Sequence, residues 1–201
     1  MADEKTPKAI LILINPQQGV YKEGALADED LGKRHIPRLL GLLRLAIKKS
    51  WSVALTLRMH DPEDDVIRSL TPHLLRGTDE PKILDELRPA LRELDEAGLL
   101  HIFEAGHFDH TIDAVEKKTE QTLYDMLPGG FEQVHVAGAW SSIDVLYTVM
   151  GLRARCGQKA DVVVWTDAVA GYDEASHGFA VRQLAVVLGA LLADEKIPLN
   201  A

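Results

Sequence analysis

An acidic residue, Asp144, lies just after the junction between an apolar strand and a helix. A carboxylate at this position could take part in catalysis. Residues 134–148 fit a buried strand, a turn at Gly138 and a helix that starts near Ser141. Backbone N–H groups at such a helix start point outward and favour negative charge. A carboxylate placed there could act as a base, an acid or a nucleophile. It could also do no more than cap the helix.

Polar side chains also follow the other strands that the apolar runs predict. Asn15 and Gln17 come after the first strand, Arg58 after the second and Lys118 after a short fourth strand. Parallel strands end at one edge of a sheet, where ligands bind, so we expect these residues and Asp144 to share a cleft. Lys118 beside the carboxylate would keep it ionised. Asn15 cannot accept a proton at neutral pH and so cannot be a base.

The elements that must position these residues alternate between strands and helices. We predict strands over residues 8–14, 51–57, 99–104, 114–117, 133–137 and 161–166. We predict helices over residues 31–49, 83–97, 141–155 and 173–193, and a long loop with a short helical piece over residues 60–81. This alternation is typical of a three-layer α/β/α fold with a mostly parallel, six-stranded sheet. No linker divides the chain, so residues 1–201 are expected to form one domain.

The bulk composition excludes several classes of protein. The formal net charge is −9, and no basic stripe offsets it, which argues against binding to nucleic acid or to an anionic membrane surface. No apolar run approaches the ~20 residues that span a bilayer. Cys156 is the single cysteine, so a disulfide within the chain is impossible. With a charged start to the sequence, this favours a cytoplasmic protein that acts on a small molecule.

Four motifs along the chain fall in a familiar order and spacing: residues 14–17, 118–124, 137–145 and 165–168. Together they resemble the isochorismatase-like hydrolases, a superfamily that includes nicotinamidases and N-carbamoylsarcosine amidases. The resemblance covers nearly the whole chain and implies that superfamily's Rossmann-like fold. It also implies a homodimer or a homotetramer. The apolar helix from Ser142, with Val145, Leu146, Val149 and Met150, could bury against the second subunit.

The resemblance assigns catalytic positions to Asn15, Lys118 and Asp144. Cysteine-using members have there an Asp that takes the thiol proton, a Lys that orients it and a Cys that attacks the substrate. The lysine alone matches in this chain. Asp144 is far less nucleophilic than a thiolate toward an amide. Some isochorismatases lack the cysteine and rely on the first-strand Asp to cleave a vinyl ether, and Asn15 removes that route as well.

Further residues are candidates for binding a substrate. Gln17 follows the first strand, and Arg58 and Arg76 could each grip a carboxylate through two hydrogen bonds, although surface arginines are the simpler interpretation. The turn formed by Ala139, Trp140 and Ser141 resembles the one that, in the family, often holds an unusual peptide bond and N–H groups of an oxyanion hole.

A metal site is not expected. Nicotinamidases have an Asp-x-His segment near the second strand, and that spacing is absent around His60 and His73. Arg58 would repel a cation nearby. His101, His107 and His110 lie on and after the third strand, fit no tight metal template and are interpreted as exposed loop residues. We therefore expect neither a metal nor another cofactor.

Two functions remain open. The first is a divergent hydrolase of a C–N or vinyl-ether bond, in which Asp144 is the base or acid and Lys118 its charge partner. Asn15 and backbone N–H groups near Trp140 would bind a carbonyl oxygen. The alternative is a catalytically inactive family member that binds a ligand or assembles with an active relative.

Overall fold

The computed structural model describes residues 8–116, 119–127, 130–156 and 159–193. Within them the strands are β1 (Ala9–Ile14), β2 (Ser52–Arg58), β3 (Leu100–Ala105), β4 (Val115–Glu116), β5 (Gln133–Ala139), β6 (Asp161–Ala170) and β7 (Leu191–Ala193). They form one seven-stranded sheet in the order β4-β3-β2-β1-β5-β6-β7. All neighbours pair in parallel except β3 and β4, so the predicted α/β fold with a mostly parallel sheet is confirmed.

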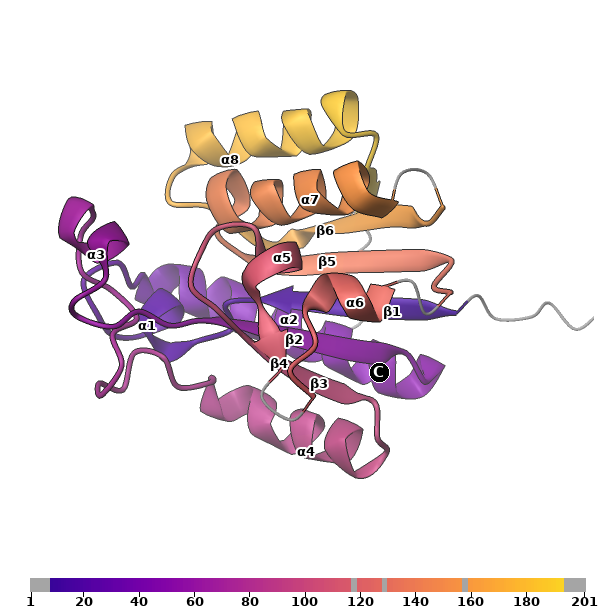
Figure 1. Ribbon diagram of the computed structural model, residues 1–201, viewed down its shortest axis with the longest axis horizontal. Helices are drawn as coiled ribbons and strands as arrows, with labels where there is room; N and C mark the ends of the chain where they lie inside the picture. Colours follow the sequence, from indigo (N-terminus) through magenta and orange to yellow (C-terminus); the bar gives the residue numbers. More distant parts are fainter. Residues whose placement is uncertain (1–7, 117–118, 128–129, 157–158, 194–201) are drawn as a thin grey trace, which may run out of the picture.

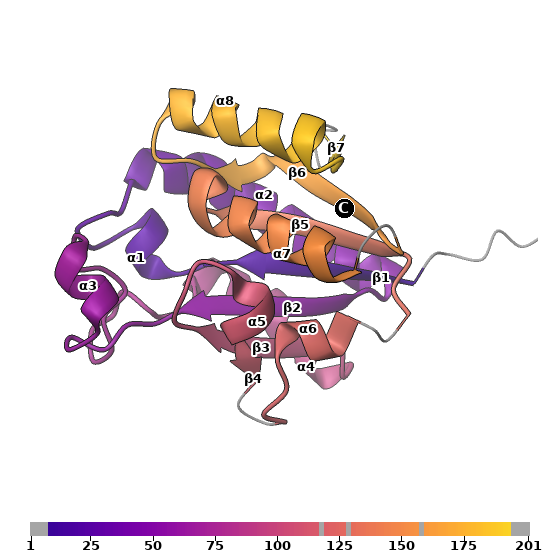
Figure 2. The ribbon, with the colours of Figure 1, turned by 45° about the horizontal axis from the view of Figure 1, so that its top comes forward.

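Helices cover both faces of this sheet (Figure 1). They are α1 (Gln18–Tyr21), α2 (Glu29–Lys49), α3 (Asp65–Ser69), the 3₁₀ turn η1 (Asp85–Leu87), α4 (Arg88–Glu96), α5 (His110–Asp113), α6 (Leu123–Met126), the π-helical turn η3 (Ser141–Val145), α7 (Leu146–Cys156), α8 (Glu174–Arg182) and the π-helical turn η4 (Gln183–Val187). In Figure 2 the helices α5, α6 and α7 lie in front of the sheet, and α2 and α4 lie behind it. None of the described helices is long and apolar enough to cross a membrane.

The central strand β1 carries the core on both of its faces. All six of its residues are buried, as expected for a strand covered on both sides. Leu11 and Leu13 belong to the cluster packed against α2 and α4, whereas Ile10 and Ile12 belong to the cluster packed against α6 and α7. This packing fixes β1 between β2 and β5 and so sets the positions of all three strand ends.

The carboxyl ends of these three strands lie level with one another. Ile14, the last residue of β1, pairs with Thr56 of β2 and with Gly138 of β5. Gly138 has a φ of 116°, and a Cβ there would overlap the carbonyl oxygen of Ile14. Glycine is therefore required for β1 and β5 to approach this closely. The residues that follow these strands, beginning with Asn15 and Trp140, are brought to one edge.

Some predictions about the elements were wrong in detail. The last helix does not run to residue 193, because helical structure ends at Val187 and Gly189 takes a φ of 61°. The chain then adds β7, a seventh strand, to the edge of β6. Of the residues expected at a subunit face, Val145 and Val149 are fully buried within this chain, in the cluster under α7, whereas Met150 is 45% exposed. The short helical piece predicted within the long loop over residues 60–81 is present as α3.

Candidate functional site

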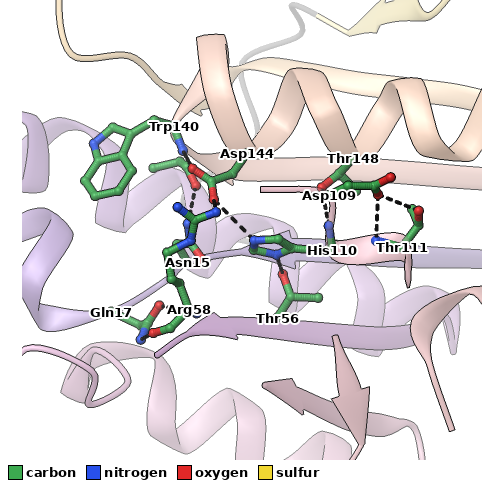
Figure 3. Close-up of polar contacts among 11 residues, drawn as sticks. Asn15, Gln17, Thr56, Arg58, Asp109, His110, Thr111, Trp140, Asp144 and Thr148 are labelled. Atoms are coloured by element: carbon green, nitrogen blue, oxygen red, sulfur yellow. Dashed lines mark hydrogen bonds and ion pairs between the residues drawn. The ribbon is translucent and has the colours of Figure 1, made fainter. Parts of the chain in front are cut away.

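The Asp144 carboxylate is fully buried and lies in the first turn of η3. Its Oδ1 is 2.6 Å from Nη2 of Arg58 and 3.2 Å from Nε2 of His110. Figure 3 shows the three side chains converging from η3, the end of β2 and the start of α5. The site is therefore built around a buried carboxylate that is paired with a guanidinium.

Arg58 is the last residue of β2, and its side chain is 1% exposed. Its guanidinium lies 4.3 Å from the centre of the Phe108 ring, a cation–π geometry that helps to hold a buried cation. Arg58 Nε is buried and, among the described residues, has no hydrogen-bond partner. A buried donor without a partner is uncommon and is expected to bind an acceptor from water or from a ligand.

Gln17 holds the backbone of Arg58 in place. Its Nε2 donates to the carbonyl oxygens of Arg58 (2.8 Å) and Pro81 (3.0 Å), and its Oε1 accepts from the N–H of Arg58 (3.0 Å). The side chain is fully buried. Gln17, predicted to bind substrate, thus has its amide occupied by main-chain groups and does not line the cavity described below.

His110 joins the site through both ring nitrogens. Nδ1 lies 2.8 Å from Oγ1 of Thr56, and Nε2 lies 3.2 Å from Asp144. The ring is fully buried, so the interpretation of His110 as an exposed loop residue was wrong. Thr56 sits two residues before Arg58 on β2, and this contact bridges 54 positions along the chain. The position of Asp109 as the N-cap of α5 was the local signal that His110 starts a helix rather than a loop.

The surroundings keep Asp144 ionised. Burial alone would raise the pKa of its carboxyl group, but the charge of Arg58 lowers it. Hydrogen bonds from His110 and Asn15 lower it further, so the pKa of Asp144 lies below its ordinary value. The carboxylate is therefore an anion at neutral pH, and it is a weak base and a weak nucleophile for the same reason.

The turn after β5 brings the backbone into contact with this anion. The peptide bond between Ala139 and Trp140 is cis, and the carbonyl oxygen of Ala139 accepts a hydrogen bond from Nδ2 of Asn15 at 3.0 Å. The N–H of Trp140 points at Oδ2 of Asp144, 3.5 Å away. The N–H group expected to serve an oxyanion hole thus faces a carboxylate of the protein itself. Ser141, next in the turn, is fully buried, and its Oγ has no hydrogen-bond partner among the described residues.

A cavity of about 260 Å³ opens beside the ion pair. Trp140 forms one side and stacks on Tyr172 with ring centres 4.6 Å apart. The remaining wall is mostly apolar, and both members of the ion pair belong to it although their side chains are almost wholly buried. The lining residues are Leu26, Arg58, Leu70, Thr71, His73, Phe108, Trp140, Ile143, Asp144 and Tyr172.

One predicted site residue lies away from the cavity. Arg76 pairs with Asp61 at 3.3 Å and with Glu104 at 3.2 Å, and it does not line the cavity. Lys118, assigned to the catalytic lysine position, lies outside the described residues. The structure thus brings together Asn15, the turn at Trp140, Arg58 and Asp144. The observed partner of the carboxylate is Arg58.

Of the two histidines considered for metal binding, His73 lines this cavity and His60 does not. The rings of His60 and His73 are 5.1 Å apart, edge to face. Burial, followed by the charge of Arg58, lowers the pKa of His60 to about 4. The described part of the chain contains no group of three His, Cys, Asp or Glu residues that could hold a metal ion.

Comparison with known proteins places this geometry in context. A family model described as the isochorismatase domain matches residues 9–195. Among solved structures, a nicotinamidase/pyrazinamidase from Bacillus subtilis is 21% identical, with 93% of this chain and 100% of that chain covered and a TM-score of 0.79. An N-carbamoylsarcosine amidase from Thermoplasma acidophilum is also 21% identical, with coverages of 95% and 99% and a TM-score of 0.71. No curated protein matches the chain. At these identities the structural matches establish a shared fold.

Proposed function

The chain belongs to the isochorismatase family, and we propose that it binds a small, flat, uncharged metabolite beside Asp144 without hydrolysing it through a covalent intermediate. The function is that of a ligand-binding member of a family whose solved relatives include amidases. The observation that carries the proposal is the buried ion pair, with 2.6 Å between Arg58 Nη2 and Asp144 Oδ1.

The ion pair disfavours attack by Asp144 on a substrate. Attack would neutralise the carboxylate and leave the Arg58 guanidinium buried without its counterion, which costs on the order of 3–5 kcal/mol. A carboxylate with a lowered pKa is also a poor nucleophile toward an amide carbon. Asn15, at the position of the family's base, donates its amide to Ala139 and cannot take a proton.

The cavity wall indicates the class of ligand. Arg58 and Asp144 carry opposite charges, so the described lining groups sum to no net charge and favour a neutral ligand. A second carboxylate would face Asp144 in a site of low dielectric, where like charges repel strongly. Arg58 Nε is a donor in need of an acceptor, which a carbonyl oxygen provides. The rings of Trp140, Tyr172 and Phe108 favour a flat molecule.

Calorimetric titration with an amide and its acid tests this ligand class. Nicotinamide is a suitable probe because solved relatives are nicotinamidases, and nicotinate differs from it only in carrying a carboxylate. We expect nicotinamide to bind at least tenfold more tightly than nicotinate, and we expect Arg58→Lys to weaken nicotinamide binding at least tenfold. Arg76→Lys is the matched control and should bind like the wild type. Tighter binding of nicotinate, or equal loss in both variants, would contradict the proposal.

Hydrolysis through an activated water is the second candidate, and the place of Asp144 in the cavity wall favours it. In this step Asp144 takes a proton from water, the hydroxide adds to the carbonyl carbon, and the C–N bond breaks as the proton passes to the leaving amine. The rate would stay level with pH above the lowered pKa of Asp144. Asp144→Asn would abolish turnover and leave ligand binding measurable.

A further inference from the structure

A buried histidine, His73, forms part of the cavity wall beside Asp144. It lies a few residues after α3 and is 3% exposed. Its ring is edge to face with two others, with 5.1 Å between the ring centres to His60 and 5.7 Å to Trp140. These contacts hold the imidazole next to the indole that forms one side of the cavity.

A hydrogen bond to the main chain determines which nitrogen of His73 carries the proton. Nδ1 lies 2.7 Å from the carbonyl oxygen of Thr71, which can only accept, so Nδ1 is the donor. Burial lowers the pKa of His73, and the ring is therefore neutral at pH 7. In a neutral imidazole with its proton on Nδ1, the other nitrogen, Nε2, has a free lone pair and is an acceptor.

This acceptor is unused within the protein. Nε2 of His73 is buried and has no hydrogen-bond partner among the described residues. Such a group is uncommon, and it is expected to receive a hydrogen bond from water or from a ligand. Arg58 Nε, which belongs to a residue of the same wall, is a buried donor that also lacks a partner in the described part of the chain. The wall therefore combines an unused donor with an unused acceptor.

We propose that His73 is a specificity-determining residue whose Nε2 accepts a hydrogen bond from an N–H group of the ligand. This inference rests on the proposed function, in which Arg58 Nε binds the carbonyl oxygen of the same ligand. The ligands that satisfy both groups are flat, uncharged molecules that carry a carbonyl oxygen and an N–H group. A ketone of the same shape would leave Nε2 buried without a partner, which weakens binding by about tenfold or more.

The neighbouring histidine, His60, provides a matched comparison. Both of its ring nitrogens are buried without a hydrogen-bond partner among the described residues, but it does not line the cavity. Burial, followed by the charge of Arg58, lowers the pKa of His60 to about 4, so this ring is neutral as well. The two histidines therefore have similar chemistry and differ in whether they belong to the cavity wall.

Calorimetric titration with two probes of the same shape tests the inference. Nicotinamide and 3-acetylpyridine share the pyridine ring and the carbonyl oxygen, and the NH₂ group of the first is a methyl group in the second. We expect the wild type to bind nicotinamide at least tenfold more tightly. His73→Phe should abolish this preference by weakening nicotinamide alone, whereas His73→Gln, whose side-chain oxygen can accept, should retain it. His60→Phe is the control and should keep the wild-type ratio.

The possible failures of the inference and of the proposed function can be distinguished. Equal affinities for the two probes in the wild type, or an unchanged ratio in His73→Phe, would overturn the inference alone. Loss of the preference in His60→Phe but not in His73→Phe would assign the acceptor to His60 and would overturn it too. If neither probe binds, the proposed function and the inference fail together. Thermal unfolding followed by circular dichroism verifies that each variant has folded, and the smaller His73→Leu replaces His73→Phe if that variant has not.

Discussion

Arg58 is the last residue of β2, and its guanidinium contacts the Asp144 carboxylate in the interior of the protein. Both side chains are almost fully shielded from solvent. Taking two charges out of water costs free energy, and their attraction offsets that cost only with close geometry and further hydrogen bonds. His110 and the Phe108 ring supply such contacts here. At the scale of single residues, each charge can be buried only because the other is beside it.

Removing one charge of the pair should therefore cost more than removing both. We expect Arg58→Met to lower the free energy of unfolding by about 3–5 kcal/mol at neutral pH, because Asp144 would stay buried without its cation. The double variant Arg58→Met, Asp144→Asn should recover a large part of that loss. Urea denaturation of the wild type, both single variants and the double variant forms a double-mutant cycle, which measures the interaction free energy of the two side chains. Additive losses would show that the two side chains do not interact.

Part of the site could be predicted from single positions in the sequence. Asn15, Trp140 and Asp144 follow strands that end side by side, and the rule for parallel sheets was enough to bring them together. The partner of Asp144 could not be predicted. The choice of Arg58, with His110 behind it, depends on side-chain directions across β2 and α5, which spacing along the sequence does not encode.

At the scale of elements, the site depends on how closely β1 and β5 approach. Gly138 pairs with Ile14, and the irregular pairing of β5 with β6 falls between Val136 and Gly138. Beyond this point β5 leads into the turn that carries Trp140 and then into η3. The position of Asp144 is thus set by strand packing at Gly138, earlier in the chain.

Gly138→Ala tests this dependence. The new Cβ would overlap the backbone of Ile14 while the residue keeps a φ of 116°, so we expect a loss of several kcal/mol or a chain that does not fold. Gly98→Ala is the matched control. Gly98 also has a positive φ, 69°, but no other group lies within 4 Å of the position that a Cβ would take, so the cost should be about 1 kcal/mol. Equal losses in thermal or urea unfolding would show that the approach of β1 and β5 is not critical.

The alternation of strands and helices was enough to predict the layers of the fold. The apolar runs at β1, β2, β5 and β6 and the amphipathic pattern of α2 and α4 each matched an observed element. The strand β7 was missed because its Leu-Leu-Ala segment continues the apolar spacing of the preceding helix. Only the turn at Gly189 and the free edge of β6 decide that this segment forms a strand.

At the scale of the whole molecule, several buried histidines link stability to pH. Burial lowers the pKa values of His35, His60 and His135 to about 4, and it lowers the pKa of His73 as well. His135 illustrates the cause, since its ring stacks on Trp51 and its Nδ1 accepts a hydrogen bond from Nε1 of Trp165 at 3.1 Å. A proton on that nitrogen would break the bond.

Stability should fall as the solution becomes acidic. Below pH 6.5 these histidines bind protons in the unfolded chain but stay neutral in the folded one down to about pH 4. The unfolded state thus gains up to about 1.4 kcal/mol per histidine and per pH unit across that window. The lowered pKa of Asp144 acts in the same direction at lower pH. Urea denaturation from pH 7.5 to 4.5 measures the slope, which His135→Asn should reduce. A stability that does not change over this range would contradict the assignment.

The most direct test of the proposed function asks whether the protein hydrolyses the amide that it binds. Nicotinamide, or a tighter amide found by titration, is incubated with stoichiometric protein in ¹⁸O-labelled water, and both ligand and protein are analysed by mass spectrometry. We predict that the amide is recovered intact and that Asp144 carries no ¹⁸O. Two results would contradict this prediction: an acid product that forms in the wild type but not in Asp144→Asn, or ¹⁸O within the Asp144 carboxylate. Either would show that Asp144 acts as a base or a nucleophile despite its ion pair with Arg58.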